Sequence, residues 1–251
     1  MKLKKIRTSL MIFTLCSGML LTSCGDSNKE NEIKEKLEET YGGQFTPSGK
    51  TPVYDFPIIP SYYRYSYKWD QLEGHSHNSV YVTTKGDSYQ TNTNYVRYYD
   101  DLYDSFTTEI GKAFPGQIVS FHFMGHMGNF ETGITDISYD EALHDQEYQL
   151  DCIIAVDDPS DHETIEKTLD NTFKGYKVRV QADIISKDVA GGLSDNTGST
   201  EENSLEIHHG YLEQLPKHEY YQYISDTESM KGATGWYDKN AYPTSKTQSE
   251  K

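Results

Sequence analysis

The hydrophobic pattern of residues 79–187 changes its period several times, and this change limits the folds open to the chain. Apolar residues at every second position are typical of strands, and apolar residues three or four positions apart are typical of helices. The strand-like stretches are residues 79–84, 117–124, 150–156 and 176–185, and the helix-like stretches are residues 94–114 and 160–175. The sequence therefore predicts an α+β fold.

The order of these stretches is strand, helix, strand, strand, helix, strand. This order suits an antiparallel sheet with two helices on one face, as in the ferredoxin-like βαββαβ arrangement. A capping box from Ser160 to Glu163 is expected to start the second helix. Strand alternation then places His122, Arg179 and Ile153 on the uncovered face of the sheet.

The segment before residue 79 predicts an N-terminal helix and an aromatic strand. Ile33, Leu37 and Tyr41 recur at helical spacing. Four prolines between residues 46 and 60 favour a loop or linker. The aromatic side chains that follow alternate along a predicted strand: Tyr63, Tyr65, Tyr67 and Trp69. Flat aromatic faces can stack on sugar rings, but packing in a core is the favoured interpretation.

The predicted body of the protein is a single α+β domain over residues 32–225, with its core in residues 79–187. Residues 191–204 are rich in Gly, Ser, Asn and acidic residues and predict a mobile loop. A short helix and a strand are expected to follow and return to the core. Residues 226–251 lack periodicity and predict a disordered tail.

The start of the chain predicts secretion and a lipid anchor. Basic residues in positions 1–7 precede a mostly apolar segment, residues 10–21, which is the layout of a signal peptide. This segment is too short to cross a bilayer as a helix. It ends in Leu21, Thr22, Ser23 and Cys24, which resemble the lipobox of bacterial lipoproteins.

The resemblance implies that the chain is cut between Ser23 and Cys24 and that the Cys24 thiol carries diacylglycerol. Residues 1–23 would be the signal peptide and residues 24–31 a lipidated tether. Two acyl chains give stable attachment to a membrane where one gives marginal attachment. The expected location is the outer face of the cell membrane. The alternative is an ordinary secreted protein with a chance cysteine at its cleavage site.

A charged helix that runs into the sequence YGGQF, residues 41–45, soon after the lipobox resembles the start of many uncharacterised lipoproteins from Gram-positive bacteria. The resemblance covers the signal and about the first twenty mature residues. It implies a location and no activity.

Charge and cysteine content exclude several classes of protein. The formal net charge is −16, so the field of the protein repels polyanions and no nucleic-acid partner is expected. After removal of residues 1–23, Cys152 is the one cysteine beyond the anchor, so no internal disulfide is expected. Alternation places Cys152 among apolar neighbours as a small buried side chain.

The residues with the most chemical potential lie in the sequence HFMGHMG. His122, Met124 and His126 are the candidate metal ligands, because imidazole with thioether suits copper and imidazole alone suits zinc. His75 and His77 form another imidazole pair. None of these spacings matches an established metal signature, so ordinary surface and turn histidines are the favoured interpretation. Asp157, Asp158 and Asp161 lie just after a predicted strand, where carboxylates can bind cations. The favoured interpretation is that acidic side chains here stabilise the positive N-terminus of the next helix.

No established catalytic motif is present, and no cofactor is expected. The predicted function is therefore a non-enzymatic binding or interaction protein of the envelope, with another envelope protein or a small ligand as its partner. The alternative is an exported metal-binding or hydrolytic protein that uses the histidines. A transporter's solute receptor is less favoured, because such receptors usually need two lobes and the pattern predicts one domain.

Overall fold

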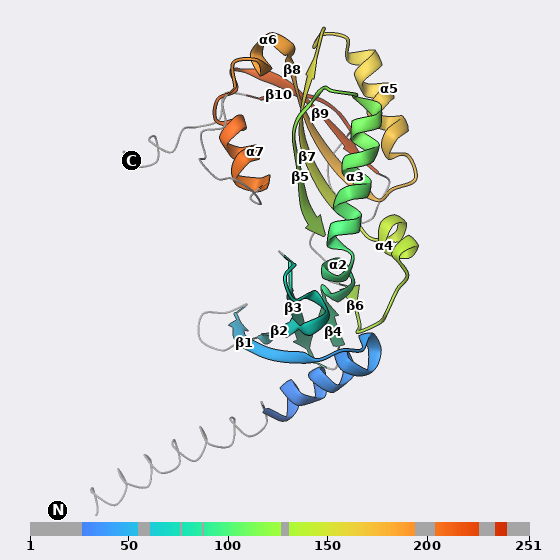
Figure 1. Cartoon of the computed structure of the whole chain (residues 1–251), viewed down its shortest axis with the longest axis vertical. Coiled ribbons are helices and arrows are strands. Elements are labelled where there is room, and N and C mark those ends of the chain that lie inside the picture. The colour runs from blue at the N-terminus through green and yellow to red at the C-terminus, as the bar shows by residue number, and fades with distance from the viewer. Residues whose placement is uncertain are drawn as a thin grey trace, which may run out of the picture. The chain divides into compact units, whose positions relative to one another are not determined.

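A computed structural model describes residues 27–54, 61–75, 77–86, 88–126, 131–193, 204–225 and 234–239 of the protein. These residues form two compact units. Unit 1 takes the described parts of Met1–Val96 and Phe130–Asp136, and unit 2 takes those of Arg97–Asn129 and Ile137–Lys251. Each unit has helices and a β-sheet, so the predicted α+β class is confirmed (Figure 1).

Unit 1 is an antiparallel sheet with a helix from the start of the described chain. Residues 27–41 are helical. The sheet has the strand order β1-β2-β3-β4-β6. Its elements are β1 (Phe45–Val53), β2 (Tyr62–Trp69), a 3-10 turn (Asp70–Leu72), β3 (Ser79–Lys85), β4 (Ser88–Thr91), β6 (Glu131–Thr132) and α2 (Thr93–Arg97), which ends one residue beyond the unit.

The aromatic strand β2 forms the core of unit 1. Tyr65, Tyr67 and Trp69 are buried against Ile33 and Leu37 of the helix. The Trp69 ring also stacks on Phe45 with 5.0 Å between ring centroids. Core packing of the aromatic face is therefore confirmed.

Two sequence expectations for unit 1 are wrong. Residues 45–53 form strand β1, whereas prolines in residues 46–60 had favoured a loop; residues 55–60 lie outside the described chain. Among the described strands β1 pairs with β2 alone, and an edge strand tolerates prolines because half of its N–H groups need no ladder partner.

The tether predicted over residues 24–31 is also too long, because the helix already includes residue 27.

Unit 2 is a mixed sheet with helices on both faces. The strand order is β10-β9-β8-β7-β5, with β7 and β8 parallel and the other neighbours antiparallel. Its elements are α3 (Tyr99–Ala113), β5 (Ile118–His126), α4 (Tyr139–Asp145), β7 (Tyr148–Val156), α5 (His162–Phe173), β8 (Val178–Ser186), α6 (Lys187–Ala190), α7 (Ser204–Leu212), β9 (His218–Ile224) and β10 (Gly235–Lys239).

The predicted helices α3 and α5 lie on the same side of this sheet (Figure 1). Their apolar stripes are fully or almost fully buried, as the periodicity predicted: Leu102, Phe106, Ile110, Ile165, Leu169 and Phe173. The Phe106 ring contacts Tyr148 of β7 edge to face, at 5.6 Å between centroids. Asp161 rather than Ser160 caps α5, accepting a hydrogen bond from the Thr164 N–H at 3.3 Å.

The single domain over residues 32–225 and the ferredoxin-like topology are not what the chain forms. The strand over residues 79–84 belongs to β3, which pairs with β2 in unit 1 through contacts such as Tyr65↔Val82. Val80 and Val82 are buried in the aromatic core there, so this strand completes the sheet of unit 1. In unit 2, β7 and β8 are direct neighbours, whereas a ferredoxin-like sheet would place another strand between them.

The end of the chain differs from the predicted disordered tail in one segment. Gly235–Lys239 is strand β10 and pairs with β9. The remainder of residues 226–251, apart from residue 234, lies outside the described residues. The short helix and strand expected before the tail are present as α7 and β9.

Replacement of Leu169 by alanine should destabilise unit 2 by about 3 kcal/mol, because it leaves a cavity beneath α5 where the leucine is fully buried. Urea unfolding followed by circular dichroism measures the change. Glu166→Ala on the exposed side of the same helix is the matched control and should change stability by less than about 0.5 kcal/mol. A cost below about 1 kcal/mol for Leu169→Ala would contradict the packing described here.

Candidate functional site

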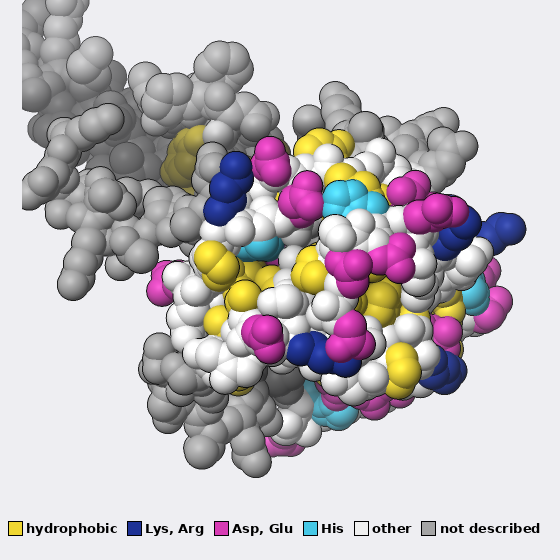
Figure 2. All heavy atoms as spheres, turned by 90° about the horizontal axis from the view of Figure 1, so that it is seen from above, with side chains coloured by type: hydrophobic (Ala, Val, Ile, Leu, Met, Phe, Trp, Pro, Cys, Tyr) yellow, Lys and Arg dark blue, Asp and Glu magenta, His cyan; other side chains and the backbone are white. Residues whose placement is uncertain are grey.

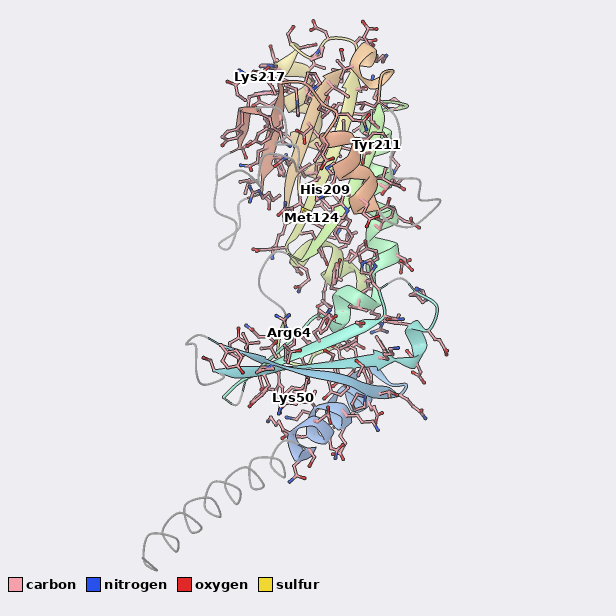
Figure 3. The ribbon with its side chains drawn as sticks, turned by 90° about the vertical axis from the view of Figure 1, so that its left-hand side faces the viewer. Lys50, Arg64, Met124, His209, Tyr211 and Lys217 are labelled. Carbon is pink, nitrogen blue, oxygen red and sulfur yellow. The ribbon has the colours of Figure 1, made fainter. Side chains whose placement is uncertain are left out.

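The second face of the unit 2 sheet carries polar side chains next to a small apolar cluster. Strand register places these polar residues on one face: Ser120, His122, Asp151, Arg179, Gln181, Asp183 and Gln222. We call them the polar face. Beside them Ile153, Ala155 and Ile185 pack against Leu212 and Leu215. Helix α7 lies over this side of the sheet, where Figure 3 labels His209 and Tyr211.

This arrangement corrects the expectation that His122, Arg179 and Ile153 mark an open face. Ile153 is fully buried in the apolar cluster, and 8% of His122 is exposed. Arg179 is half-buried and donates from Nη2 to the Gln222 Oε1 at 2.7 Å. Part of the face is therefore covered by α6, α7 and the residues that follow α7.

A buried carboxylate joins three strands on the polar face. Asp183 of β8 has no exposed surface. His218 Nε2 on β9 donates to its Oδ1 at 2.6 Å, and Lys239 Nζ on β10 donates to Oδ1 and Oδ2 at 2.8 and 3.1 Å. Burial alone would raise the pKa of Asp183, but the hydrogen bond from His218 and the charge of Lys239 outweigh it and lower that pKa.

The geometry of His218 fixes the orientation of its ring. Its Nδ1 lies 2.7 Å from the Pro216 carbonyl oxygen, and its Nε2 lies 2.6 Å from the Asp183 carboxylate. Each ring nitrogen therefore has an oxygen within hydrogen-bond distance. Asp183 is thus held between the His218 ring and the Lys239 ammonium, which offsets the cost of burying its charge.

His208 of α7 is buried with an unsatisfied nitrogen. Its Nδ1 lies 2.9 Å from the Ser120 hydroxyl, and its Nε2 has no hydrogen-bond partner among the described residues. The imidazole of His122 is 6.1 Å away between ring centroids. Burial lowers the pKa of His208 to about 4, so the ring is neutral at pH 7.

Asp151 is an acid with no cation hydrogen-bonded to it in the described chain. It lies directly across from His122 in the strand register, and its closest donor is the Gln149 Nε2 at 3.4 Å. Burial raises the pKa of Asp151 to about 6, and the nearby charge of Asp183 adds to this rise. Asp151 is therefore a carboxyl group that exchanges a proton close to neutral pH.

A pocket of about 310 Å³ lies where strand β8 ends. We call it the end pocket. It is lined by Pro159, Ile184, Ile185, Ser186, Val189, Pro216, Lys217, His218 and Glu219. Figure 2 looks onto this end of unit 2 and shows hydrophobic side chains lying among acidic and basic ones. Because His218 also binds Asp183, the wall of the end pocket is fixed by the buried ion pairs.

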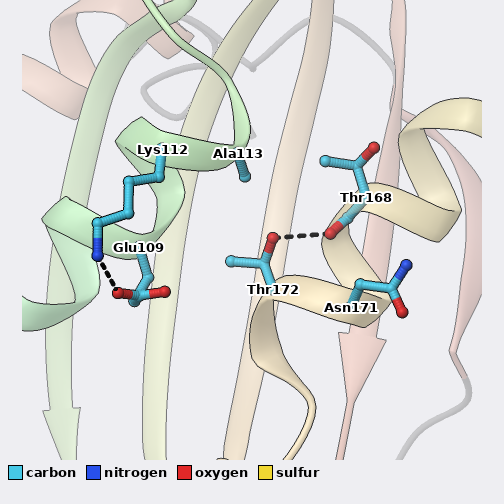
Figure 4. Close-up of a pocket in the computed structure, with 6 residues that line it drawn as sticks. All are labelled: Glu109, Lys112, Ala113, Thr168, Asn171 and Thr172. Atoms are coloured by element: carbon cyan, nitrogen blue, oxygen red, sulfur yellow. Dashed lines mark hydrogen bonds and ion pairs between the residues drawn. The ribbon is translucent and has the colours of Figure 1, made fainter.

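A second hollow, of about 410 Å³, lies between α3 and α5 on the opposite side of the sheet (Figure 4). Its polar groups are largely engaged within their own helices. Lys112 pairs with Glu109 at 2.7 Å, and the Thr172 hydroxyl donates to the Thr168 carbonyl at 2.7 Å. This hollow is shallower and more open to solvent than the end pocket.

The site residues predicted from the sequence lie in different environments, and some of them are outside the described residues. The anchor Cys24, with Ser23 before it, lies outside the described residues. His122 is buried, whereas Met124 is 48% exposed and its sulfur accepts from the Gln149 amide at 3.0 Å. The side chain of His126 lies outside the described part of the structure. His122 and Met124 therefore differ in environment, which the alternation of the strand did not predict.

In the described part of the chain, no three His, Cys, Asp or Glu side chains are grouped so as to hold a metal ion. The three aspartates near α5 have structural roles: Asp157 pairs with Lys187 at 2.7 Å, Asp158 accepts from Ser160, and Asp161 caps the helix. Cys152 is free and fully buried, and burial raises the pKa of its thiol, which keeps it neutral. Helix-start chemistry is thus confirmed for Asp158 and Asp161 but not for Asp157, and the burial of Cys152 is confirmed.

Sequence reasoning missed the residues that matter most in this arrangement: Asp183, His208, His218 and Lys239. One signal was available for Asp183. It lies in the run Ala182, Asp183, Ile184, Ile185, where apolar residues occupy both faces of the strand. Such a run predicts that the strand end is buried on both sides, so the charged residue within it needs partners.

Comparison of the chain with protein-family models, with curated proteins and with solved structures gives no match. Within the described ranges, no helix has the length and apolar content needed to span a bilayer.

Asp151 and His208 make opposite contributions to the pH dependence of stability. Between pH 4.5 and 6 the folded protein holds a proton on Asp151 that the unfolded chain has released, so this residue lowers stability as the pH rises. In the same range the unfolded chain holds a proton on His208 that the folded protein lacks, so this residue raises stability as the pH rises. The two contributions offset each other in the natural chain.

Asp151→Asn should therefore unmask His208, and unfolding free energy should rise by about 1 kcal/mol per pH unit from pH 4.5 to 6. His208→Gln should give a fall of similar slope. Urea unfolding at several pH values measures both, with the exposed Asp100→Asn as control. A pH profile for Asp151→Asn that matches the natural chain would show that Asp151 titrates normally in the folded state.

Proposed function

We propose that this chain is a lipid-anchored binding protein on the outer face of the cell membrane and that it binds a small ligand in the end pocket of unit 2. The anchor is Cys24, which ends the lipobox-like sequence Leu21, Thr22, Ser23, Cys24. Cleavage before Cys24 and attachment of two acyl chains would hold the mature chain at the membrane without a spanning helix.

The observation that carries the binding function is the end pocket with its fixed wall. Its volume of about 310 Å³ lies at the lower end of the range for small-ligand sites. It also lies at the carboxyl end of β8, which runs parallel to β7, and open sheets with parallel strands commonly hold ligands at that end. Both features support a small molecule rather than a large protein surface as the ligand.

The buried contacts of Asp183 hold one wall of the end pocket in place before a ligand binds. His218 lines the pocket, and both of its nitrogens are already used by Pro216 and Asp183. Its side chain is therefore held in one orientation before a ligand arrives. A wall that does not have to be ordered on binding lowers the entropic cost of association.

The proposal is for binding and not for catalysis. Ser120 and His208 are within hydrogen-bond distance, but His208 Nδ1 faces the hydroxyl and no described carboxylate bonds to Nε2. A serine nucleophile of the usual kind needs a base that a third group orients. This geometry supports a structural hydrogen bond.

Cys24→Ser should abolish lipid attachment, and the protein should no longer carry a diacylglycerol group. Intact-mass measurement of the protein from the membrane fraction tests this, with metabolic labelling by a tagged fatty acid as a second measurement. Cys16→Ser is the matched control, because Cys16 lies within the expected signal peptide. Unchanged lipid labelling of Cys24→Ser would reject the anchor.

A second candidate function is metal handling, and one observation favours it. The buried Nε2 of His208 has no partner among the described residues, and the ring of His122 lies 6.1 Å away. Neutral imidazole nitrogens are ligands for zinc and copper, and the Ser120 hydroxyl at the other nitrogen would help to hold the ring in place.

Elemental analysis of the purified full chain tests this second function. It predicts one equivalent of zinc or copper that is lost in His208→Gln and kept in His209→Gln, the exposed neighbour on α7. Absence of metal after incubation with either ion would reject it and leave the binding function in place.

A further inference from the structure

The lining of the end pocket divides into an apolar interior and a polar rim. Ile185 and Val189 belong to the apolar cluster on the α7 side of the sheet and form the interior, and Ile184, whose side chain lies on the opposite face of β8, also lines the pocket. Lys217 and Glu219 are exposed and lie at the rim, and Lys217 is labelled in Figure 3. A ligand that fills this pocket therefore has an apolar body and one polar end.

The rim offers a ligand hydrogen-bond donors and one uncompensated positive charge. The Lys217 ammonium has no hydrogen bond or ion pair with any described residue. The Ser186 hydroxyl oxygen accepts from the Val189 N–H at 3.3 Å, and the hydroxyl hydrogen has no acceptor in the described chain. Two donors among the residues that line one pocket suit an acceptor group, and a cation among them favours an anion.

The other charged groups at the rim are already paired. The Glu219 carboxylate lies 2.9 Å from His162 Nε2, and the His162 ring stacks on Trp236 with 3.9 Å between centroids. Both ring nitrogens of His218 are already engaged within the protein, by the Pro216 carbonyl and by Asp183. Lys217 is therefore the charge at the rim that a ligand can neutralise.

The volume gives the scale of the part of a ligand that lies inside the pocket. A cavity of about 310 Å³ holds about ten water molecules at roughly 30 Å³ each, so it suits a body of roughly eight to ten non-hydrogen atoms.

We propose that the end pocket binds a small amphiphile in which a short apolar body ends in one carboxylate, with the carboxylate at Lys217 and Ser186 and the apolar body over Ile184, Ile185 and Val189. This inference names the ligand class of the binding function proposed above and rests on that function.

Three probes that differ in their head group test the proposal: hexanoate, hexanol and hexylamine. The full lipidated chain is placed in lipid nanodiscs, and isoleucine methyl groups are followed by NMR at about 0.15 M salt, where the field of distant acidic residues is screened beyond about 8 Å. Methyl signals of Ile184 and Ile185 report on the pocket. The signal of the distant core residue Ile110 is the internal control.

Hexanoate should shift the Ile184 and Ile185 signals with half-saturation near or below about 1 mM, and hexanol should bind about tenfold more weakly. Hexylamine should bind most weakly of the three, because its charge is repelled by Lys217. Lys217→Gln should weaken hexanoate about tenfold and leave hexanol unchanged. The matched control Lys174→Gln, an exposed lysine just after α5, should change neither.

A second pair of variants tests the location. Val189→Trp should fill the pocket and abolish the shifts from hexanoate, whereas Asp188→Trp on the exposed side of α6 should preserve them. Both variants add the same side chain to the same short helix, so a general effect of the indole would appear in both.

The outcomes separate the two proposals. Equal binding of the three probes would overturn the carboxylate inference and leave a binding pocket in place. No shift with any probe would overturn both the inference and the proposed binding function. The carboxylate of a peptide C-terminus has the same chemistry, so tighter binding of acetyl-leucyl-leucine than of hexanoate would support the inference and assign the ligand to peptides.

Discussion

The buried carboxylate of Asp183 is the interaction on which much of unit 2 depends. An aspartate without any exposed surface is costly unless cations and donors surround it. Its two partners come from different strands, His218 at the start of β9 and Lys239 at the end of β10. The charge therefore links β8 to the last two strands of the sheet, and removal of either partner would leave a buried charge poorly compensated.

Several features of unit 2 follow from this one group. Strand β10 has five residues and pairs with β9 alone among the described strands, so its own contacts are few. The ion pair through Lys239 gives it a fixed place. The same carboxylate orients His218, whose ring then forms part of the wall of the end pocket. The contacts of Asp183 therefore hold β10 in the sheet and also shape one wall of the end pocket.

The parts of the fold that were predictable from the sequence are those with a local period. Helices α3 and α5 and strands β5, β7 and β8 each carry a repeated apolar face, which a single segment is long enough to show. No such local signal shows which strands pair with each other. Residues 79–84 alternate in the same way in either sheet, and only the aromatic core of unit 1 decides that β3 pairs with β2.

The candidate site was harder to predict for the same reason. Asp183 is 35 positions from His218 and 56 from Lys239, so no short motif contains the group. The end pocket likewise collects residues from Pro159 to Glu219. The histidines that did stand out, His122 and His126, were conspicuous because they are close in sequence, which says little about where their side chains lie.

The exposed edge of strand β1 bears on whether neighbouring copies of the protein associate. This strand is the outermost described one of unit 1, and many of its residues are exposed. An unprotected strand of this kind offers its backbone to a neighbouring molecule, and crowded chains can then join edge to edge. Pro47 and Pro52 lack the N–H that such pairing requires, and the register shifts between Pro47 and Gly49. These irregularities favour separate molecules over self-association, even at high local concentration.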